Sequence, residues 1–155
     1  MLRDTRGITL IELLVIISIL SILLIIPAYK GNNIQNYKER KELREFKNDI
    51  NYARNRAVVE SRLYRIDIRT NNNSYLIIKY SKFPETIKKK EFTNGIKVKS
   101  TNIENDELVF NYSGAPKNAG TIYLENSKGE TIEITITPAT GKVNIYYNRK
   151  GKKNE

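Results

Sequence analysis

The sequence predicts an α+β fold in which a long N-terminal helix, transmembrane at first and then amphipathic, packs on a small antiparallel β-rich head. Three observations predict it. Residues 8–28 form an apolar run, apolar residues then recur at helical spacing to about residue 59, and from residue 61 the apolar period becomes two. We therefore divide the chain into a leader (1–7), a membrane helix (8–28), an amphipathic continuation (29–60), a β-rich head (61–147) and a basic tail (148–155).

The apolar run has the length of a membrane span. About 21 residues at about 1.5 Å each make a helix of about 30 Å, the thickness of a bilayer's hydrocarbon core. Its unusual residue is Glu12, because a carboxylate at this depth costs roughly 2.5–3.5 kcal/mol and needs a partner. Cleavage between Gly7 and Ile8 would create an amine that begins a helix whose fifth residue is Glu12. The two charges would then share one layer of packed helices, within a chain or between neighbours.

The basic leader, Gly7 and the letters ITLIELLV resemble the type III signal of type IV prepilins and pseudopilins. The resemblance implies that a membrane aspartyl peptidase, the prepilin peptidase, cuts after Gly7 and methylates the amine of Ile8. It also implies that Glu12 registers each subunit against the amine of its neighbour in a filament. The family most often has Phe as its first mature residue, where this chain has Ile8. Arg3 and Arg6 would remain in the cytoplasm, which places the head on the other side of the membrane.

Two other interpretations of this segment explain less. A secretory signal peptide has an apolar core of about 7–15 residues followed by a small-residue cleavage site. Here the run is longer, contains Glu12 and ends in PAYKG, without such a site. A simple signal anchor explains the span but gives Glu12 no role.

The composition limits the function classes. The net charge is +10, from 27 Lys and Arg against 17 Asp and Glu, and about +9 without the leader. A positive charge of this size favours binding to nucleic acid, to anionic lipid headgroups or to acidic partners. The Asn, Ile and Lys bias of an AT-rich genome would explain the same charge equally well. There is no Cys and no His, so the usual general bases, nucleophiles and metal ligands are missing. We expect no enzyme, no cofactor and no metal.

The segment after residue 34 predicts an amphipathic helix, continuous with the first, from about residue 8 to residue 59. Apolar residues at three- and four-residue steps share one face, which is expected to pack on the sheet that follows. These are Leu43, Phe46, Ile50, Ala53 and Ala57. Charged residues fill the other face: Lys38, Glu39, Arg40, Lys41, Glu42, Arg44, Glu45 and Lys47.

Short strands follow. Residues 64–69 and 75–80 predict a hairpin across the turn at 71–74, where Asn tolerates left-handed backbone. The run Lys88, Lys89 and Lys90 leads to a strand at 96–99, and another strand is expected at 108–112. Residues 121–125 and 131–137 flank the turn NSKG and predict a second hairpin, and the last strand is expected at 142–147.

The second half narrows the resemblance. The letters ARNRA at 53–57, then Phe110 and Gly114, then GTIYL and ITITPATGKV are similar to GspH/FimT-type pseudopilins and minor pilins. The resemblance implies a long helix against two small antiparallel sheets. It implies a structural subunit of a type IV pilus, a type II secretion-like pseudopilus or a competence pseudopilus, inserted in the inner membrane and later part of a periplasmic or surface filament. The implied partners are other pilin subunits, the prepilin peptidase and membrane lipid.

Two further clusters invite a binding hypothesis. The tail has Arg149, Lys150, Lys152 and Lys153 beside Tyr146 and Tyr147, a combination that could follow phosphates and stack bases. Some FimT-like minor pilins bind DNA during natural transformation, which makes DNA a possible partner; the alternative is a solvated tail. Residues 102–107 carry oxygen ligands for calcium, but they lack the glycine and the alternation of a calcium loop, so we expect a polar loop.

Overall fold

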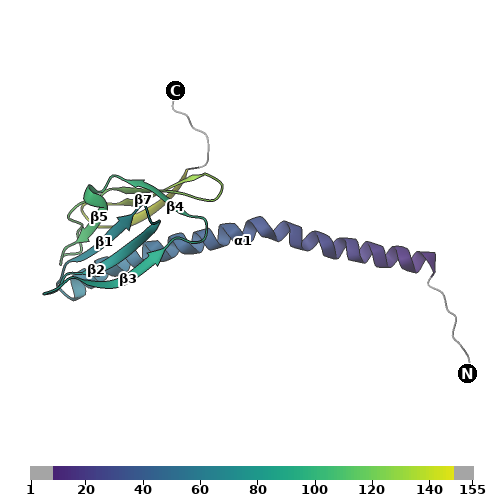
Figure 1. The fold of residues 1–155 in the computed structure, drawn as a ribbon, viewed down its shortest axis with the longest axis horizontal. Coiled ribbons are helices and arrows are strands. Elements are labelled where there is room, and N and C mark those ends of the chain that lie inside the picture. Colours follow the sequence, from purple (N-terminus) through teal and green to yellow (C-terminus); the bar gives the residue numbers. More distant parts are fainter. Residues whose placement is uncertain (1–8, 149–155) are drawn as a thin grey trace, which may run out of the picture. The chain divides into compact units, whose positions relative to one another are not determined.

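The computed structural model describes the backbone of residues 9–148 and the side chains of residues 9–22 and 34–147. The chain divides into two units, Met1–Tyr37 and Lys38–Glu155. Helix α1 (Leu10–Val59) belongs to both and continues through Pro27, as the sequence predicts (Figure 1). The second unit is the head together with the part of α1 that packs on it.

Two antiparallel four-stranded sheets complete the head (Figure 1). Sheet A has the order β3-β2-β1-β5 and sheet B the order β4-β6-β7-β8. The elements are β1 (Tyr64–Arg69), β2 (Ser74–Lys79), β3 (Glu85–Glu91), β4 (Lys97–Thr101), the 3-10 turn η1 (Glu104–Asp106), β5 (Glu107–Phe110), β6 (Thr121–Glu125), β7 (Thr131–Ile136) and β8 (Val143–Asn148). The α+β class is confirmed, and so are the two sheets that the family resemblance implies.

The apolar face of α1 lies in the core. All five residues predicted to share this face are at most 1% exposed, and they join side chains of both sheets in one cluster. The ring of Phe46 lies 4.5 Å from that of Tyr75 on β2 and 5.3 Å from that of Phe92 after β3. Helical spacing alone therefore identified the face of α1 that holds the head together.

The turn between β1 and β2 contains Asn73, which has a φ of 46°. Its carboxamide donates to the carbonyls of Phe92 at 2.9 Å and Ile96 at 2.8 Å, and accepts the Val98 N–H at 2.7 Å. Phe92 directly follows β3 of sheet A, and Val98 lies in β4 of sheet B. The segment between β3 and β4 connects the two sheets. One side chain therefore fastens a turn of sheet A to both ends of the connection between the sheets.

Strand β3 was not predicted. Its sequence, ETIKKKE, lacks apolar alternation, and we expected its three lysines only as a basic run before the next strand. The strand forms because β2 offers a ladder partner along its whole length, while β3 is the edge of sheet A, where charged side chains face water. At the other end of the chain, β8 extends to Asn148, one residue beyond the predicted strand.

The prediction that every charged residue of α1 lies away from the core is wrong for Glu39 and Glu42. They are 3% and 4% exposed. Glu42 accepts the Thr93 N–H at 2.8 Å and two donors of Asn94, and Glu39 accepts the N–H and hydroxyl of Ser127. Both continue the apolar stripe, four residues before Leu43 and Phe46, at a level where α1 meets loop N–H groups that need acceptors. Their helical spacing therefore indicated a buried position, although their charge suggested an exposed one.

Two buried tyrosines donate hydrogen bonds from their hydroxyls to carboxylates. One carboxylate is on α1, and the other belongs to Glu60, the residue that follows α1. Tyr64 donates to Glu60 at 2.9 Å, and Tyr75 donates to Asp49. Burial, together with the hydrogen bond to Glu60, raises the pKa of Tyr64 to about 12. Burial and the bond to Asp49 also raise the pKa of Tyr75. Each phenol is therefore held neutral where the unfolded chain would ionise it.

These tyrosines predict that the free energy of unfolding falls as the pH rises from about 10 to about 12. The unfolded phenol loses its proton near pH 10, whereas folded Tyr64 keeps it to about pH 12, so high pH favours the unfolded chain. The slope is at most about 1.4 kcal/mol per pH unit for each tyrosine. Urea unfolding of the full chain in detergent, followed by near-ultraviolet circular dichroism, measures it. Tyr64→Phe should reduce the slope, while Tyr112→Phe, at a side chain 69% exposed, should not; equal slopes in Tyr64→Phe and wild type would contradict the assignment.

Candidate assembly helix and charged surfaces

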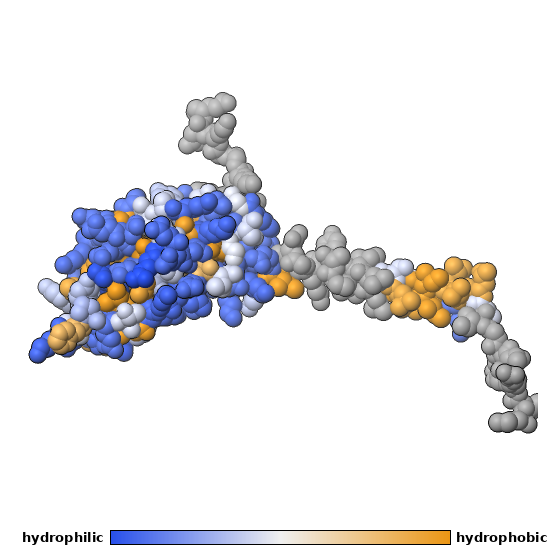
Figure 2. Space-filling model, viewed as in Figure 1, coloured by the Kyte–Doolittle hydropathy of each residue, from blue (hydrophilic) through white to orange (hydrophobic). Residues whose placement is uncertain are grey.

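The first part of α1 presents apolar side chains on every side. All described side chains from Leu10 to Ile22 are exposed, and the large apolar ones are 43–78% exposed. Figure 2 shows them as a continuous apolar surface. A helix that is apolar all round is normally covered by lipid or by other helices.

The polar groups of this segment are satisfied within the helix, with one exception. The hydroxyls of Ser18 and Ser21 each donate at 2.8 Å to the carbonyl four residues earlier. The N–H of Glu12 donates to the Thr9 hydroxyl at 3.3 Å. Within the described part of the chain, no side chain or backbone group donates to the Glu12 carboxylate. That carboxylate is the one charge on an otherwise apolar surface.

Several predicted site residues lie outside the described residues. Gly7 and Ile8, the expected cleavage and methylation site, precede residue 9, and Arg149, Lys150, Lys152 and Lys153 follow residue 148. Among the described residues, no helix combines the length and the apolar character needed to cross a membrane.

The three lysines of β3 are engaged in ion pairs. Lys88 Nζ lies 3.2 Å from Glu45 and 2.7 Å from Asp49, and Lys90 Nζ lies 3.2 Å from Glu45. Lys89 pairs with Glu91 at 3.3 Å. Burial opposes ionisation of Glu45, but hydrogen bonds from Lys88 and Lys90 outweigh it and lower its pKa. Two of the lysines thus fasten the edge of sheet A to α1 and do not form a free basic patch.

The oxygen-rich stretch at 102–107 also serves the fold. Asn102 accepts the Thr121 N–H at 2.6 Å, Asp106 accepts the Thr101 hydroxyl at 2.8 Å, and Glu107 lies 2.9 Å from Arg65. Within the part of the chain that the structure describes, no three Asp or Glu side chains gather closely enough to hold a metal ion.

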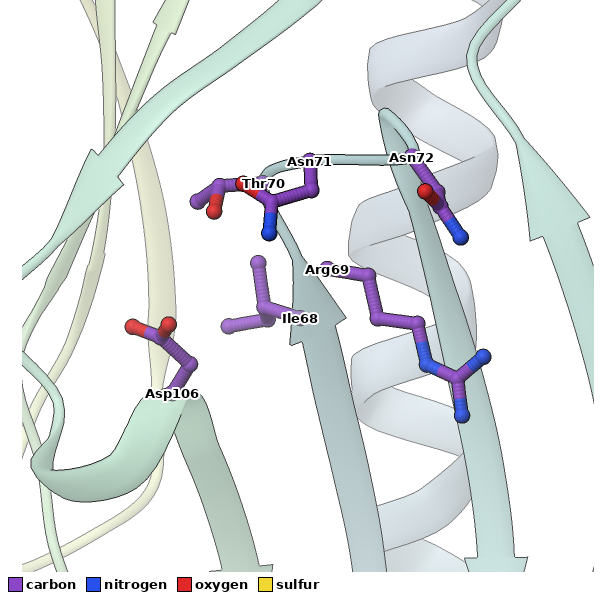
Figure 3. Close-up of a pocket in the computed structure, with 6 residues that line it drawn as sticks. All are labelled: Ile68, Arg69, Thr70, Asn71, Asn72 and Asp106. Carbon is purple, nitrogen blue, oxygen red and sulfur yellow. The ribbon is translucent and has the colours of Figure 1, made fainter.

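A polar hollow of about 360 Å³ lies between the β1–β2 turn and η1 (Figure 3). Figure 3 shows that Asp106 reaches it from η1, while the guanidinium of Arg69 points away from Asp106. The two charges therefore do not converge on one ligand. Its lining residues are Ile68, Arg69, Thr70, Asn71, Asn72 and Asp106.

Several residues of the C-terminal sequence pattern that resembles GspH/FimT-type pseudopilins meet at one point of the head. Arg54 Nε donates to the Gly114 carbonyl at 3.3 Å. Gly141, with a φ of 61°, lies so close that an added Cβ would be 2.9 Å from that carbonyl and 3.2 Å from Phe110. These positions are spread over almost ninety residues of sequence, yet they form one packing contact. The pattern therefore describes how the head is built and gives no ligand site.

Two family models match the chain. Residues 2–26 match the prokaryotic N-terminal methylation motif. Residues 42–141 match the type II transport protein GspH, from the buried Glu42 on α1 to Gly141 before β8. No curated protein and no solved structure gives a significant match. Because the second match covers most of the chain, and the first lies over the predicted cleavage motif, the chain belongs to the GspH family of type II transport pseudopilins, structural subunits of the type IV pilin class.

Proposed function

We propose that the chain is a minor pseudopilin that is cut after Gly7, methylated at Ile8 and assembled through its N-terminal helix into a short filament of a type II secretion-like machine. The observation that carries this proposal is the surface of α1 between Leu10 and Ile22, exposed and apolar on every side, with the Glu12 carboxylate as its single charge. Such a surface needs a cover of lipid or of other helices. A carboxylate on it also needs a partner, which a bundle of helices can supply and lipid cannot.

The proposed mechanism pairs charges between subunits. Cleavage leaves an ammonium at Ile8, four residues before Glu12 and thus about one helical turn away. In a bundle of staggered helices, the carboxylate of one subunit can accept from the amine of the next, which removes two isolated charges from an apolar interior at once. Before assembly, the helix is a single-pass inner-membrane anchor, and the head lies outside the cytoplasm. The pairing fixes the axial position of each incoming subunit.

The test is the intact mass of the chain after coexpression with its prepilin peptidase. We expect a wild-type product that begins at Ile8, about 14 Da heavier when its amine is methylated. Gly7→Ala should remain uncut, because the peptidase is expected to need glycine before the scissile bond. Thr5→Ala, in the same leader, should be processed normally. An uncut wild type would leave the segment as an ordinary anchor and remove the role proposed for Glu12.

The second candidate function is DNA capture by the basic tail. It is supported by Tyr146 and Tyr147, each 52% exposed on β8 immediately before the tail. Exposed aromatic rings beside basic residues suit base stacking and phosphate contacts. Lys88 and Lys90 add no free charge to this surface, because both are paired with carboxylates of α1. Replacing the four basic tail residues by Gln should abolish salt-sensitive binding of a DNA duplex if this function holds.

A further inference from the structure

In one short stretch of α1, the acidic side chains face the head and most of the basic side chains are exposed. Between residues 38 and 47 the sequence has five basic and three acidic residues, so it reads as nearly balanced. The acids turn toward the head: Glu39 and Glu42 are buried against its loops, and Glu45 lies against lysines of β3. Four basic residues stay exposed. We call this set the basic collar: Lys38, Arg40, Lys41 and Arg44.

The four collar residues are exposed and form no ion pair among the described residues. Lys38 and Lys41 line a hollow of about 270 Å³ together with Lys90, Asn94 and the carboxylates of Glu42 and Glu45, which already accept hydrogen bonds from Thr93, Asn94, Lys88 and Lys90. Arg44 Nε donates to the Arg40 carbonyl at 3.2 Å, which turns this guanidinium back along the helix. At 3.6 residues per turn, the four positions cover about 160° of the helix circumference.

The collar comes soon after the apolar segment in the chain. Lys38 lies ten positions after Ala28 in the sequence, about 15 Å of helix. Helical side chains lean toward the N-terminus of their helix. The headgroup layer of a bilayer is about 5–7 Å thick, and charges act over a further 8–10 Å at physiological salt. The spacing along the chain therefore lets collar charges act on the headgroup layer when the apolar segment is in the membrane.

We propose that the basic collar binds the phosphates of anionic phospholipid headgroups, and so holds the head of an unassembled subunit at the membrane surface. The inference rests on the membrane anchor of the proposed function. Lipid suits the collar better than nucleic acid does. Its cations are spread around almost half of a helix, as phosphates would surround a helix leaving a bilayer. Arg40 lies 5.7 Å from the centre of the Tyr147 ring, but one ring is not the row of stacking rings along a groove that single-stranded nucleic acid uses. Each exposed cation is expected to increase the equilibrium constant for association of the head with an anionic surface roughly five-fold.

The experiment uses the full chain in nanodiscs of phosphatidylcholine, with or without phosphatidylglycerol. The chain has no cysteine, so Lys128→Cys in the β6–β7 turn, beside the residue that binds Glu39, gives a single labelling site. A fluorophore there is quenched by spin-labelled headgroups when the head lies close to the bilayer. We expect stronger quenching with phosphatidylglycerol, and loss of this difference at about 0.5 M salt.

The collar variant replaces all four collar residues by Gln and should abolish the response to phosphatidylglycerol. A matched variant removes the same charge from exposed positions elsewhere on the head: Arg62, Lys82, Lys117 and Lys142. This variant should keep the response, and an unchanged near-ultraviolet spectrum shows that each variant is folded. Equal loss in both variants would make the effect one of net charge and overturn the proposal.

Two other results would also overturn it. One is equal quenching in both kinds of nanodisc for the wild type. The other is collar-dependent binding of a DNA duplex in phosphatidylcholine nanodiscs without any response to phosphatidylglycerol, which would assign the surface to nucleic acid. Flotation with phosphatidylcholine vesicles separates the two levels of inference. A chain that does not float lacks the proposed anchor, whereas a chain that floats without responding to phosphatidylglycerol lacks only the lipid contact of the collar.

Discussion

Glu12→Ala is expected to abolish filament assembly while cleavage after Gly7 and folding of the head remain normal. Among the described side chains from Leu10 to Ile22, Glu12 carries the only charge, so its removal should make membrane insertion of the monomer easier by roughly 2.5–3.5 kcal/mol. In the proposed filament, the same change would leave the Ile8 ammonium of a neighbour unpaired in an apolar bundle, a cost of several kcal/mol. We therefore expect at least a ten-fold loss of sedimentable filament, since about 1.4 kcal/mol corresponds to a factor of ten.

The measurement is the amount of subunit in sheared and pelleted filaments, after overexpression with the other components of the machine. Ser18→Ala is the matched control, because the Ser18 hydroxyl bonds within its own helix to Leu14 and carries no charge. Glu12→Asp should assemble weakly, as it keeps the charge on a shorter side chain. Normal filaments from Glu12→Ala would refute the charge pairing and would leave apolar packing as the only assembly force.

Asn73→Ala is expected to destabilise the head by about 3–5 kcal/mol, as much as the truncation of a large buried apolar side chain. The carboxamide makes three hydrogen bonds, each worth about 1 kcal/mol, and two of its partners belong to the connection between the sheets. At a φ of 46°, alanine adds about 1–2 kcal/mol of backbone cost. The Val98 N–H also loses its acceptor inside the head, which costs more than the bond alone.

Urea unfolding of the full chain in detergent measures this effect through the tyrosine signal of the head. Asn72→Ala is the control, because Asn72 is exposed in the same turn and should change stability by less than about 0.5 kcal/mol. Asn73→Gly separates the causes, since glycine accepts the left-handed backbone but restores none of the hydrogen bonds. Similar stabilities for the two alanine variants would show that the turn does not fasten the sheets together.

The elements that sequence reasoning found are those whose signal is local. The stripe from Leu43 to Ala57 repeats at helical spacing, and the hairpin from Thr121 to Ile136 has both alternation and a turn signal. Strand β3 has neither, because its charged side chains are suited to an edge position that only the finished sheet defines. Glu39 and Glu42 look like solvent-facing residues until loops from residues 93, 94 and 127 reach them.

The same distinction applies to the candidate sites. Gly7, Ile8 and Glu12 were predicted because charge, cleavage site and apolar length follow one another within a few residues. The basic collar could not be predicted, since the acids that would neutralise it are removed by contacts with residues about fifty to ninety positions away. Lys88 and Lys90 were expected as a basic run, and their partners on α1 lie about forty positions earlier. Net charge in a sequence is thus a poor guide to the charge that a folded surface presents.

The charged edge strand of sheet A affects whether crowded heads can exchange strands. In a filament, many copies of the head are held close together, a condition under which open strand edges join and sheets from different molecules fuse. Strand β3 resists this because its lysines would have to leave water or their partners before a foreign strand could pair with it. The register with β2 also shifts between Ile77 and Ile78, which interrupts the regular edge that a foreign strand would follow. Strand exchange at this edge is thereby disfavoured, and order in the polymer can be left to the helices.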